Sequence, residues 1–502
     1  MSRRKKTARA QAIVGPTPLE QALVRFKPLL SADEFTELLA ELEKPLPQAL
    51  RVNPLKNAHS LDSVEKWATR YGWQVQPVAF CPSGWLILSN RTAPSHTPEQ
   101  RLGFYYIQDA ASMLPVELFD FDLLPQNPLI LDMAASPGGK TTHLVSNTLD
   151  RGLVIANDSS ADRLMALRLV LQNWGAINTA VTHFPGERFG SWLPERFDAV
   201  LLDAPCSMQS LRSIEGHSMH AITPREHKDI TQRQQRLIIS AFQTLKVGGQ
   251  LVYSTCSLSP EEDEAIVDDL LCLFPGQVRV EAPTRLPKPA PGLLSDGSRS
   301  FDPSVEHSVR LWPQRYGTAG FFAARVTKLV SVPNVAGDPP SRPWERSGLE
   351  SMSAKNCRLL VEQIQQNYSF DLGPTQEAQN LSLFQRQNQV FAIPQQLLES
   401  FPDLPVQAAG MLLGELNPMG FRPSHEFTAR FGMHFNRGVI LLPEEALPGW
   451  LRGEDVWVSM EQGLPVGQVL AVRDTSERLL GNGKLLANGK LKNLLPRRIL
   501  FQ

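Results

Sequence analysis

The sequence predicts an α/β protein with a parallel central sheet, and three observations support this prediction. Short apolar runs alternate with helical patterns through the middle of the chain. The runs show no polar alternation, as is typical of strands buried on both faces. A Gly-Gly pair lies between the first run and the first helical pattern, where a strand would turn tightly into a helix. The five runs occupy residues 129–133, 153–156, 179–182, 199–202 and 251–254.

The helical patterns fill the intervals between these runs. Gly175 is expected to close the second pattern and Gly248 the third. Ser259 is expected to cap the fourth, with Glu261 and Glu262 near the positive end of its dipole. Strands and helices in this alternation predict helices on both faces of the sheet and ligands at the carboxyl ends of the strands. The four patterns occupy residues 140–149, 161–174, 224–245 and 260–274.

Outside this core the chain is expected to divide at two places. Residues 331–349 contain four prolines and lack periodicity, which indicates an extended linker. A softer boundary lies near residues 101–106, after a stretch punctuated by prolines. The predicted units are 1–105, 106–330, the linker 331–349, 350–435 and 436–502.

Composition excludes several classes of protein. Hydrophobic residues make up 42% and charged residues 20%, as is usual for soluble proteins with real cores. No apolar run approaches the roughly 18 residues of a membrane helix, and the basic residues 1–10 are not followed by an apolar stretch. Five scattered cysteines without a C-x-x-C pair predict neither a disulfide framework nor a zinc site. His217 and His220 share a helical face but lack a third ligand. We therefore expect a cytoplasmic protein without a metal.

Charge is balanced over the whole chain but not along it. Fifty basic residues face fifty-one acidic residues, for a net charge of −1. Residues 1–110 carry fourteen basic and ten acidic residues, and six basic residues follow Glu477 without an acid. These ends are either solvated termini or two contacts with phosphate.

The first strand runs into Asp132-Met133-Ala134-Ala135-Ser136-Pro137-Gly138-Gly139-Lys140-Thr141-Thr142. The second ends at Asn157-Asp158, where an acidic side chain is suited to bind the two hydroxyls of a ribose. Together these features indicate a ligand that contains adenosine. A nucleoside triphosphatase is a distant alternative, because a Walker loop needs glycine where Ala134 stands.

Two of the five cysteines lie at the ends of consecutive predicted strands. Asp203-Ala204-Pro205-Cys206 closes the fourth strand and Ser254-Thr255-Cys256-Ser257 the fifth. A single cysteine is most often a small buried hydrophobe, but chance rarely places two at the ligand edge of one sheet. Each is also expected to adjoin a helix start, where the dipole and nearby cations lower the pKa of a thiol.

These residues resemble the motifs of S-adenosylmethionine-dependent RNA cytosine-5 methyltransferases that carry two cysteines, in particular the bacterial enzymes that act on small-subunit (16S) ribosomal RNA. The resemblance extends over nearly the whole chain, through residues 51–53, 106–113, 320–325 and 491–497. It implies a class I, Rossmann-like methyltransferase core at 106–330 behind an N-terminal α+β RNA-binding domain. It further implies an intermediate domain at 350–435 and a PUA-like RNA-binding domain at 436–502.

The resemblance also implies residue roles. Cys256 is the nucleophile that adds to C6 of cytosine, so that C5 can accept a methyl group, and Cys206 assists release. Asp203 hydrogen-bonds the pyrimidine, and Lys140 lies over the same pocket. The implied methyl donor is S-adenosylmethionine. Its implied binding residues are Ala134, Ala135, Ser136, Pro137, Gly138, Gly139, Lys140, Asp158, Arg163 and Asp203.

The implied partner is small-subunit ribosomal RNA or the 30S subunit, bound by a monomer. Two departures from the family pattern lie in the site. Pro185 stands where an acidic residue usually contacts the adenine amino group, and Met208-Gln209-Ser210 replaces a Gly-x-Gly turn. They keep a second interpretation open, namely a ribosome-binding homologue with weak or lost methyltransferase activity.

Overall fold

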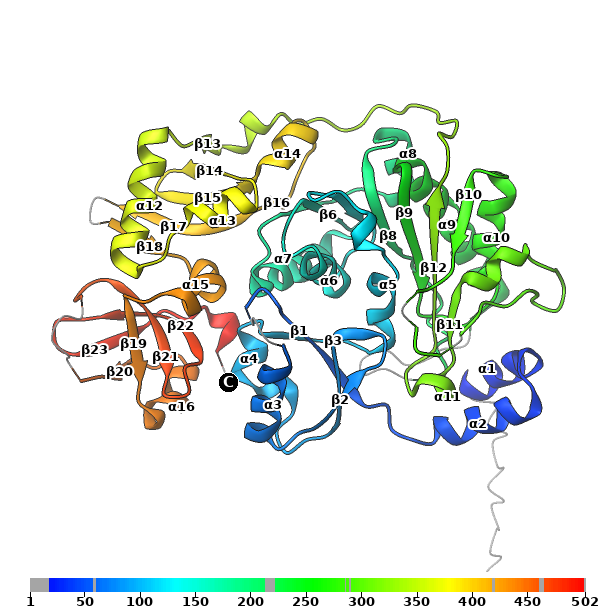
Figure 1. Cartoon of the computed structure of the whole chain (residues 1–502), viewed down its shortest axis with the longest axis horizontal. Coiled ribbons are helices and arrows are strands. Elements are labelled where there is room, and N and C mark those ends of the chain that lie inside the picture. The colour runs from blue at the N-terminus through cyan, green and yellow to red at the C-terminus, as the bar shows by residue number, and fades with distance from the viewer. Residues whose placement is uncertain are drawn as a thin grey trace, which may run out of the picture.

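A mixed sheet of nine strands forms the centre of the computed structural model (Figure 1). The structure describes residues 18–56, 60–212, 222–284, 286–288, 290–417, 420–459 and 465–500. The strand order is β10-β12-β9-β8-β5-β6-β7-β16, and β11 pairs with β12. The five predicted strands pair in parallel, and β10, β11, β12 and β16 pair antiparallel. This confirms the α/β, Rossmann-like core. The strands are β5 (Leu129–Asp132), β6 (Leu153–Asn157), β7 (Thr179–Thr182), β8 (Phe197–Asp203), β9 (Leu245–Thr255), β10 (Val278–Glu281), β11 (Val309–Leu311), β12 (Phe321–Lys328) and β16 (Ala408–Ala409).

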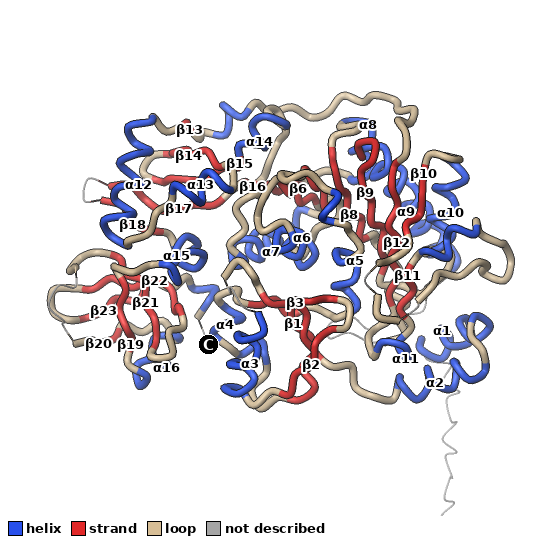
Figure 2. The backbone as a smooth tube through the Cα atoms, viewed as in Figure 1, coloured by secondary structure: helices blue, strands red, loops and turns tan. Residues whose placement is uncertain are grey.

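Helices cover both faces of this sheet, because successive strand residues point to opposite sides (Figure 2). On one face, Ile130 and Val154 pack with α5 (Leu114–Glu117), α6 (Gly139–Asn147) and α7 (Ala161–Trp174). On the other face, Leu131 and Val200 pack with α9 (Pro224–Thr244) and α10 (Glu264–Leu273), beside α8 (Phe189–Trp192). The loops at the carboxyl ends of the parallel strands therefore lie at one edge of a rigid scaffold.

Two of the expected helix boundaries are wrong. The helix at 161–174 is confirmed, and Gly175 closes it with a φ of 81°. The helix expected at 260–274 begins instead at Glu264, because the carboxylates of Glu262 and Asp263 are hydrogen-bonded into neighbouring loops. Gly248 does not close a helix either, since α9 ends at Thr244 and Gly248 lies within β9.

The N-terminal part contains a four-stranded sheet of order β2-β3-β1-β4. Helices α1 and α2 lie away from this sheet, beside α11 (Pro313–Tyr316) (Figure 1). They share a small apolar core with Leu211 and Leu258, which follow the two candidate cysteines. The elements are α1 (Pro18–Phe26), α2 (Ala32–Leu42), β1 (Gln48–Val52), α3 (Ser60–Tyr71), β2 (Gln74–Val78), β3 (Cys81–Ser89), α4 (Pro98–Arg101) and β4 (Tyr105–Ile107).

Residues 331–343 form neither helix nor strand and cross to two further sheets of five strands each (Figure 1). The first sheet is built from β13 (Glu350–Ser351), β14 (Leu381–Arg386), β15 (Gln389–Pro394), β17 (Met411–Asn417) and β18 (Gly420–Pro423), with α12 (Ala354–Tyr368), α13 (Gly373–Ala378) and α14 (Gln395–Ser400). The second, which fits the expected PUA-like region, is built from β19 (Val439–Leu442), β20 (Val456–Trp457), β21 (Val469–Asp474), β22 (Leu479–Leu485) and β23 (Lys490–Asn493), with α15 (His425–Phe431) and α16 (Leu447–Leu451).

Strand β16 connects the C-terminal part directly to the central sheet. Ala408 and Ala409 pair with Val181 and Ala180 of β7. The flanking residue Gln407 donates its backbone N–H to the carbonyl of Val181 at 2.7 Å. The C-terminal part thus supplies the last strand of the core. Among the described residues, no helix is both long enough and apolar enough to cross a membrane.

Candidate active site

The loop between β5 and α6 needs both of its glycines. Gly138 has a φ of 112°, a left-handed conformation that other residues rarely adopt. A Cβ atom on Gly139 would lie 2.8 Å from the ring of Tyr106, so a side chain is excluded there. The loop is tied to the next strand, because Ala135 donates its N–H to the carbonyl of Asn157 at 2.7 Å. The expected cofactor loop is therefore a fixed turn at the strand edge.

Asp158 and Arg163 both contact this loop. One carboxylate oxygen of Asp158 accepts the backbone N–H of Ser136 at 3.1 Å, and the other accepts that of Ser160 at 2.9 Å. Arg163 donates to the carbonyl of Ser136 and lies 3.7 Å from Asp158. Asp158, Arg163 and Ser136, which were expected to bind one cofactor, are therefore in contact with one another.

A residue of the N-terminal part of the chain, Arg51, contacts the same loop. Arg51 is fully buried, and its guanidinium lies 4.6 Å from the ring of Trp174. It donates to the carbonyl of Gly139 at 3.0 Å and to the hydroxyl of Thr142. The two parts of the protein therefore share one rigid interface at the site.

Lys140 and Asp203 form an ion pair at the centre of the edge. Their Nζ and Oδ2 atoms are 2.8 Å apart, and Lys140 also donates to the hydroxyl of Ser112 at 2.8 Å. Ser254 donates its hydroxyl to the other oxygen of Asp203 at 2.9 Å. Burial opposes the charge of Lys140, but the charges of Asp203 and Cys256 raise the pKa of Lys140 above its usual value. A largely buried cation is thus held close enough to interact with the charge of the second candidate cysteine.

The two candidate cysteines meet. The Sγ atoms of Cys206 and Cys256 are 3.0 Å apart, because β8 and β9 are adjacent parallel strands that pair Asp203 with Ser254. The hydrogen bond with Cys256, burial, and the charges of Cys256 and Glu262 raise the pKa of the Cys206 thiol well above its usual value.

The expectation that each cysteine adjoins a helix start is wrong. The described helices that follow Cys206 and Cys256 begin only at Pro224 and Glu264. Both cysteines lie instead in loops beyond the strand ends, since the carboxylates of residues 262 and 263 keep the second loop from continuing as a helix. A lysine side chain, rather than a helix dipole, is the positive group near Cys256.

Both departures from the family pattern have a structural counterpart. Met208 has a φ of 56°, so this loop keeps the left-handed backbone for which glycine is usual. Pro185 precedes a short turn in which Glu187 accepts from Arg233 of α9 at 3.2 Å. Arg233 also donates to the hydroxyl of Ser159, next to Asp158. An acidic side chain thus lies two residues beyond Pro185, held by an arginine.

The sequence reasoning missed the residues that support the cysteines. Ser112 and Ser254 contact Lys140 and Asp203, and no local pattern marks them. Glu262 accepts the backbone N–H of Ser207 at 2.8 Å, although the sequence predicted it in the first turn of a helix, near the positive end of the dipole. The repeated Cys-Ser pair at 206–207 and 256–257 is the signal that could have revealed a common support.

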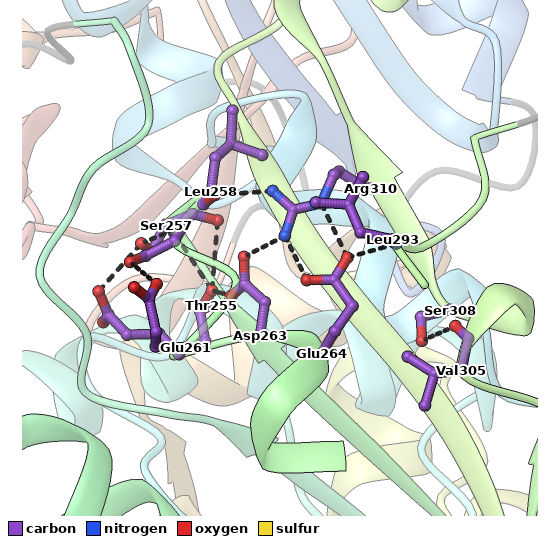
Figure 3. Close-up of polar contacts among 12 residues, drawn as sticks. Thr255, Ser257, Leu258, Glu261, Asp263, Glu264, Leu293, Val305, Ser308 and Arg310 are labelled. Carbon is purple, nitrogen blue, oxygen red and sulfur yellow. Dashed lines mark hydrogen bonds and ion pairs between the residues drawn. The ribbon is translucent and has the colours of Figure 1, made fainter. Parts of the chain in front are cut away.

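A buried arginine closes the site from the side of β11. Figure 3 shows Arg310 between the carbonyl of Leu258 and the carboxylates of Asp263 and Glu264. All three charged side chains are fully buried. Thr255 donates its hydroxyl to Asp263 at 2.6 Å, one residue before Cys256. Ionic and hydrogen-bonded contacts therefore fix the loop of Cys256 at both of its ends.

One group of the described residues has the composition of a metal site. Cys81, Glu117 and His143 are neighbours, with 2.9 Å between His143 Nε2 and Glu117 Oε1. Burial raises the pKa of Cys81 to about 12 and, together with the charge of Arg51, lowers that of His143 to about 4. The charge of Glu117 favours the protonated forms of Arg51 and His143, and Cys81, His143 and Glu117 form a hydrogen-bonded group.

The basic C-terminal tail is folded onto the rest of the protein. Its residues form parts of β22 and β23, and three of its six cations are paired within the protein. Those three are Arg478 with Asp474, Lys490 with Asp455, and Arg498 with Glu426. His217, His220 and the basic residues 3–9 lie outside the described part of the chain.

Known proteins resemble this chain over most of its length. The family model "16S rRNA methyltransferase RsmB/F" matches residues 122–327, and "N-terminal domain of 16S rRNA methyltransferase RsmF" matches residues 20–110. The ribosomal RNA small subunit methyltransferase F of Aeromonas salmonicida is 34% identical and that of Pectobacterium carotovorum 32%, over 94% of this chain and 94% and 92% of theirs. The crystal structure of a methyltransferase homologue from Pyrococcus horikoshii aligns with a TM-score of 0.53 and 31% identity, covering 62% of this chain and 99% of its own. The chain therefore belongs to the 16S rRNA methyltransferase RsmB/F family.

Proposed function

We propose that the protein transfers a methyl group from S-adenosylmethionine to C5 of a cytosine in small-subunit ribosomal RNA, through a covalent bond between Cys256 and C6. The observation that carries the proposal is the pair of sulfurs 3.0 Å apart beside the ion pair of Lys140 and Asp203. Curated relatives that are similar over 94% of the chain are named for methylation of the small ribosomal subunit.

The residues at the ends of β5 and β6 fit the methyl donor. The glycine turn at 138–139 lets a ligand approach the backbone, and the carboxylate of Asp158 is suited to ribose hydroxyls. Arg163 and residues 134–137 would complete the binding site, with Lys140 and Asp203 on the side of the transferred group. When bound, S-adenosylmethionine supplies an electrophilic methyl group.

The side chains divide the chemistry between them. Cys256 adds to C6 as a thiolate and moves an electron pair to C5, with the cation of Lys140 beside the same pocket. Asp203 accepts a hydrogen bond from the amino group of the base; a proton passes through its carboxyl group to N3 when Cys256 adds and returns by the same route when the base is released. After methyl transfer, water accepts the proton of C5, the released electron pair re-forms the C5–C6 double bond, and Cys256 leaves as a thiolate. The thiol of Cys206 donates a hydrogen bond to this leaving sulfur, 3.0 Å away.

The test uses labelled S-adenosylmethionine and small ribosomal subunits from a strain that lacks the protein. Cys256→Ala should abolish methylation, and Cys206→Ala should leave a covalent protein–RNA adduct of reduced gel mobility. Cys272→Ala is the matched control, because this cysteine is exposed on α10. An adduct in Cys256→Ala rather than Cys206→Ala would reverse the two roles. Binding to the subunit without methylation by the wild type would favour the inactive homologue instead.

The C-terminal sheet offers a contact for the RNA. Lys484 and Lys492 are directly opposite each other on β22 and β23, and Trp457 of β20 is opposite Lys490. The alternation of the strands places these side chains on the face opposite to the buried pair Leu485 and Leu491. Like charges in direct opposition destabilise a sheet unless an anion neutralises them. Trp457 is 66% exposed and gives a base a ring on which to stack.

This contact is tested by the salt dependence of RNA binding. The double substitution of Lys484 and Lys492 by glutamine should reduce the log–log slope by roughly 0.7–0.9 for each phosphate that the variant no longer neutralises. Lys355→Gln is the matched control, because Lys355 is exposed on α12. An unchanged slope in the double variant would remove this face from the RNA site.

A further inference from the structure

A single buried carboxylate joins the loops of the two cysteines. Glu262 is fully buried, and its Oε2 atom accepts the backbone N–H of Ser207 at 2.8 Å. Its Oε1 atom accepts the hydroxyl of Ser207 and, at 3.2 Å, that of Ser257. Ser207 follows Cys206 in the chain and Ser257 follows Cys256. One side chain is therefore bonded to the residue after each cysteine.

Glu262 is itself held in place. Gln234 of α9 donates to the Oε2 atom at 3.3 Å and to the carbonyl of Pro205 at 2.9 Å. Tyr253 of β9 donates its hydroxyl to the backbone carbonyl of Glu262 at 2.5 Å. The next two residues are anchored by Arg310 (Figure 3). Since a buried carboxylate costs several kcal/mol unless hydrogen bonds compensate, this arrangement is a built feature of the loop pair.

Glu262 also distinguishes the two thiols. Its negative charge acts on Cys206, where it adds to the effects of Cys256 and of burial in raising the pKa of the Cys206 thiol. Lys140, by contrast, interacts with Cys256, whose negative charge helps to raise the pKa of the Lys140 ammonium group. The two sulfurs are 3.0 Å apart. For one to act as a thiolate and the other as a thiol, a positive charge must lie near the first and a negative charge near the second.

We propose that Glu262 is a positioning residue that holds the loops of Cys206 and Cys256 in register and so gives the two cysteines separate roles. Cys206 then stays a hydrogen-bond donor for the departing sulfur while Cys256 acts as the nucleophile. This inference rests on the proposed function, because the two roles are defined by the proposed cysteine chemistry. The hydrogen bonds of Glu262 exist without RNA or the methyl donor.

The first test needs neither substrate. Iodoacetamide is added to the whole protein at pH 8, and alkylation of Cys206 and Cys256 is followed by peptide mass spectrometry. In the wild type, Cys256 should react faster than Cys206. In Glu262→Gln, which keeps the side-chain shape but removes the charge, Cys206 should react faster than in the wild type, because a negative charge that opposes its thiolate is gone. Glu261→Gln is the control, because its carboxylate lies on the same turn but pairs with Arg25.

The second test uses RNA and the methyl donor. Glu262→Gln should lower kcat and leave KM for RNA unchanged, and covalent adduct should accumulate at steady state, because release is impaired while addition continues. A lower kcat without adduct would overturn the assignment to release. Unchanged reactivity of Cys206 in folded Glu262→Gln would overturn the inference, even if methylation by the wild type were normal. Conversely, altered reactivity without any methylation would overturn only the proposed function.

A milder variant keeps the inference testable if Glu262→Gln does not fold. Ser207→Ala removes the hydroxyl contact to the carboxylate but keeps the backbone contact. Because the charge of Glu262 stays, Cys206 should remain slow to alkylate, whereas the loosened loop should lower kcat and let covalent adduct accumulate, with normal circular dichroism. An unchanged kcat without adduct in this variant would contradict the positioning role of the carboxylate.

Discussion

Replacement of Arg310 by methionine should destabilise the core by about 3–5 kcal/mol, which is the usual cost of removing one partner of a buried ion pair. Arg310 is fully buried and donates to Glu264 at 2.8 Å, to Asp263 at 3.2 Å and to the carbonyl of Leu258 at 2.7 Å. Methionine fills part of the same volume but leaves the carboxylate of Glu264 without its cation.

Thermal unfolding measures this loss. For a core of this size each kcal/mol shifts the midpoint by about 2–4 °C, so a fall of about 6–20 °C is expected. Arg279→Met is the control, because Arg279 is 59% exposed and its pair with Glu281 should contribute little. Adding Glu264→Gln to Arg310→Met should recover part of the loss, since the unpaired charge is then gone. A shift no larger than that of Arg279→Met would show that the buried ion pair contributes no more to stability than an exposed one.

Burial raises the pKa of Asp132 to about 7, so between roughly pH 4 and pH 7 the folded state holds a proton that the unfolded state has lost, and stability falls as pH rises through that window. Asp132→Asn should flatten this fall in melting curves recorded from pH 5 to pH 8, and parallel curves for both proteins would contradict it. Pro185→Asp supplies an acceptor near the expected adenine site and should tighten S-adenosylmethionine binding by about one to two decades in calorimetry. Equal affinities would exclude that gain, and a loss in Glu187→Ala would then identify Glu187 as the substitute. Because Met208 already has a left-handed backbone, Met208→Gly should change the melting midpoint by less than about 4 °C, and a larger fall would show that the methionine side chain packs.

The parts of the fold that local signals decide could be predicted from the sequence. The helix at 161–174 agrees with its pattern to the residue, because periodic apolar residues and Gly175 act within one segment. The meeting of Cys206 and Cys256 also followed from sequence, since neighbouring parallel strands bring their ends together.

Other parts depend on contacts between distant segments. Ser259-Pro260-Glu261-Glu262 has the composition of a helix start, but the hydrogen bonds that Glu262 accepts from the loop of Cys206 move the start of the helix to Glu264. These contacts link residues more than fifty positions apart, so no local pattern reports them. Strand β16 escaped notice for the same reason, because a pair of alanines becomes a strand only through its partner β7.

The pairing of β16 with β7 has a consequence for how the chain is made. An uncovered sheet edge is a template for association with other chains. Ala408 lies 227 residues after Val181, and at usual rates of synthesis it emerges about 10–45 s later. The nascent protein therefore carries an open edge until its C-terminal part arrives to seal it. A chain truncated in the linker would keep that edge open permanently, and we expect it to aggregate although every residue of the two-cysteine site is present.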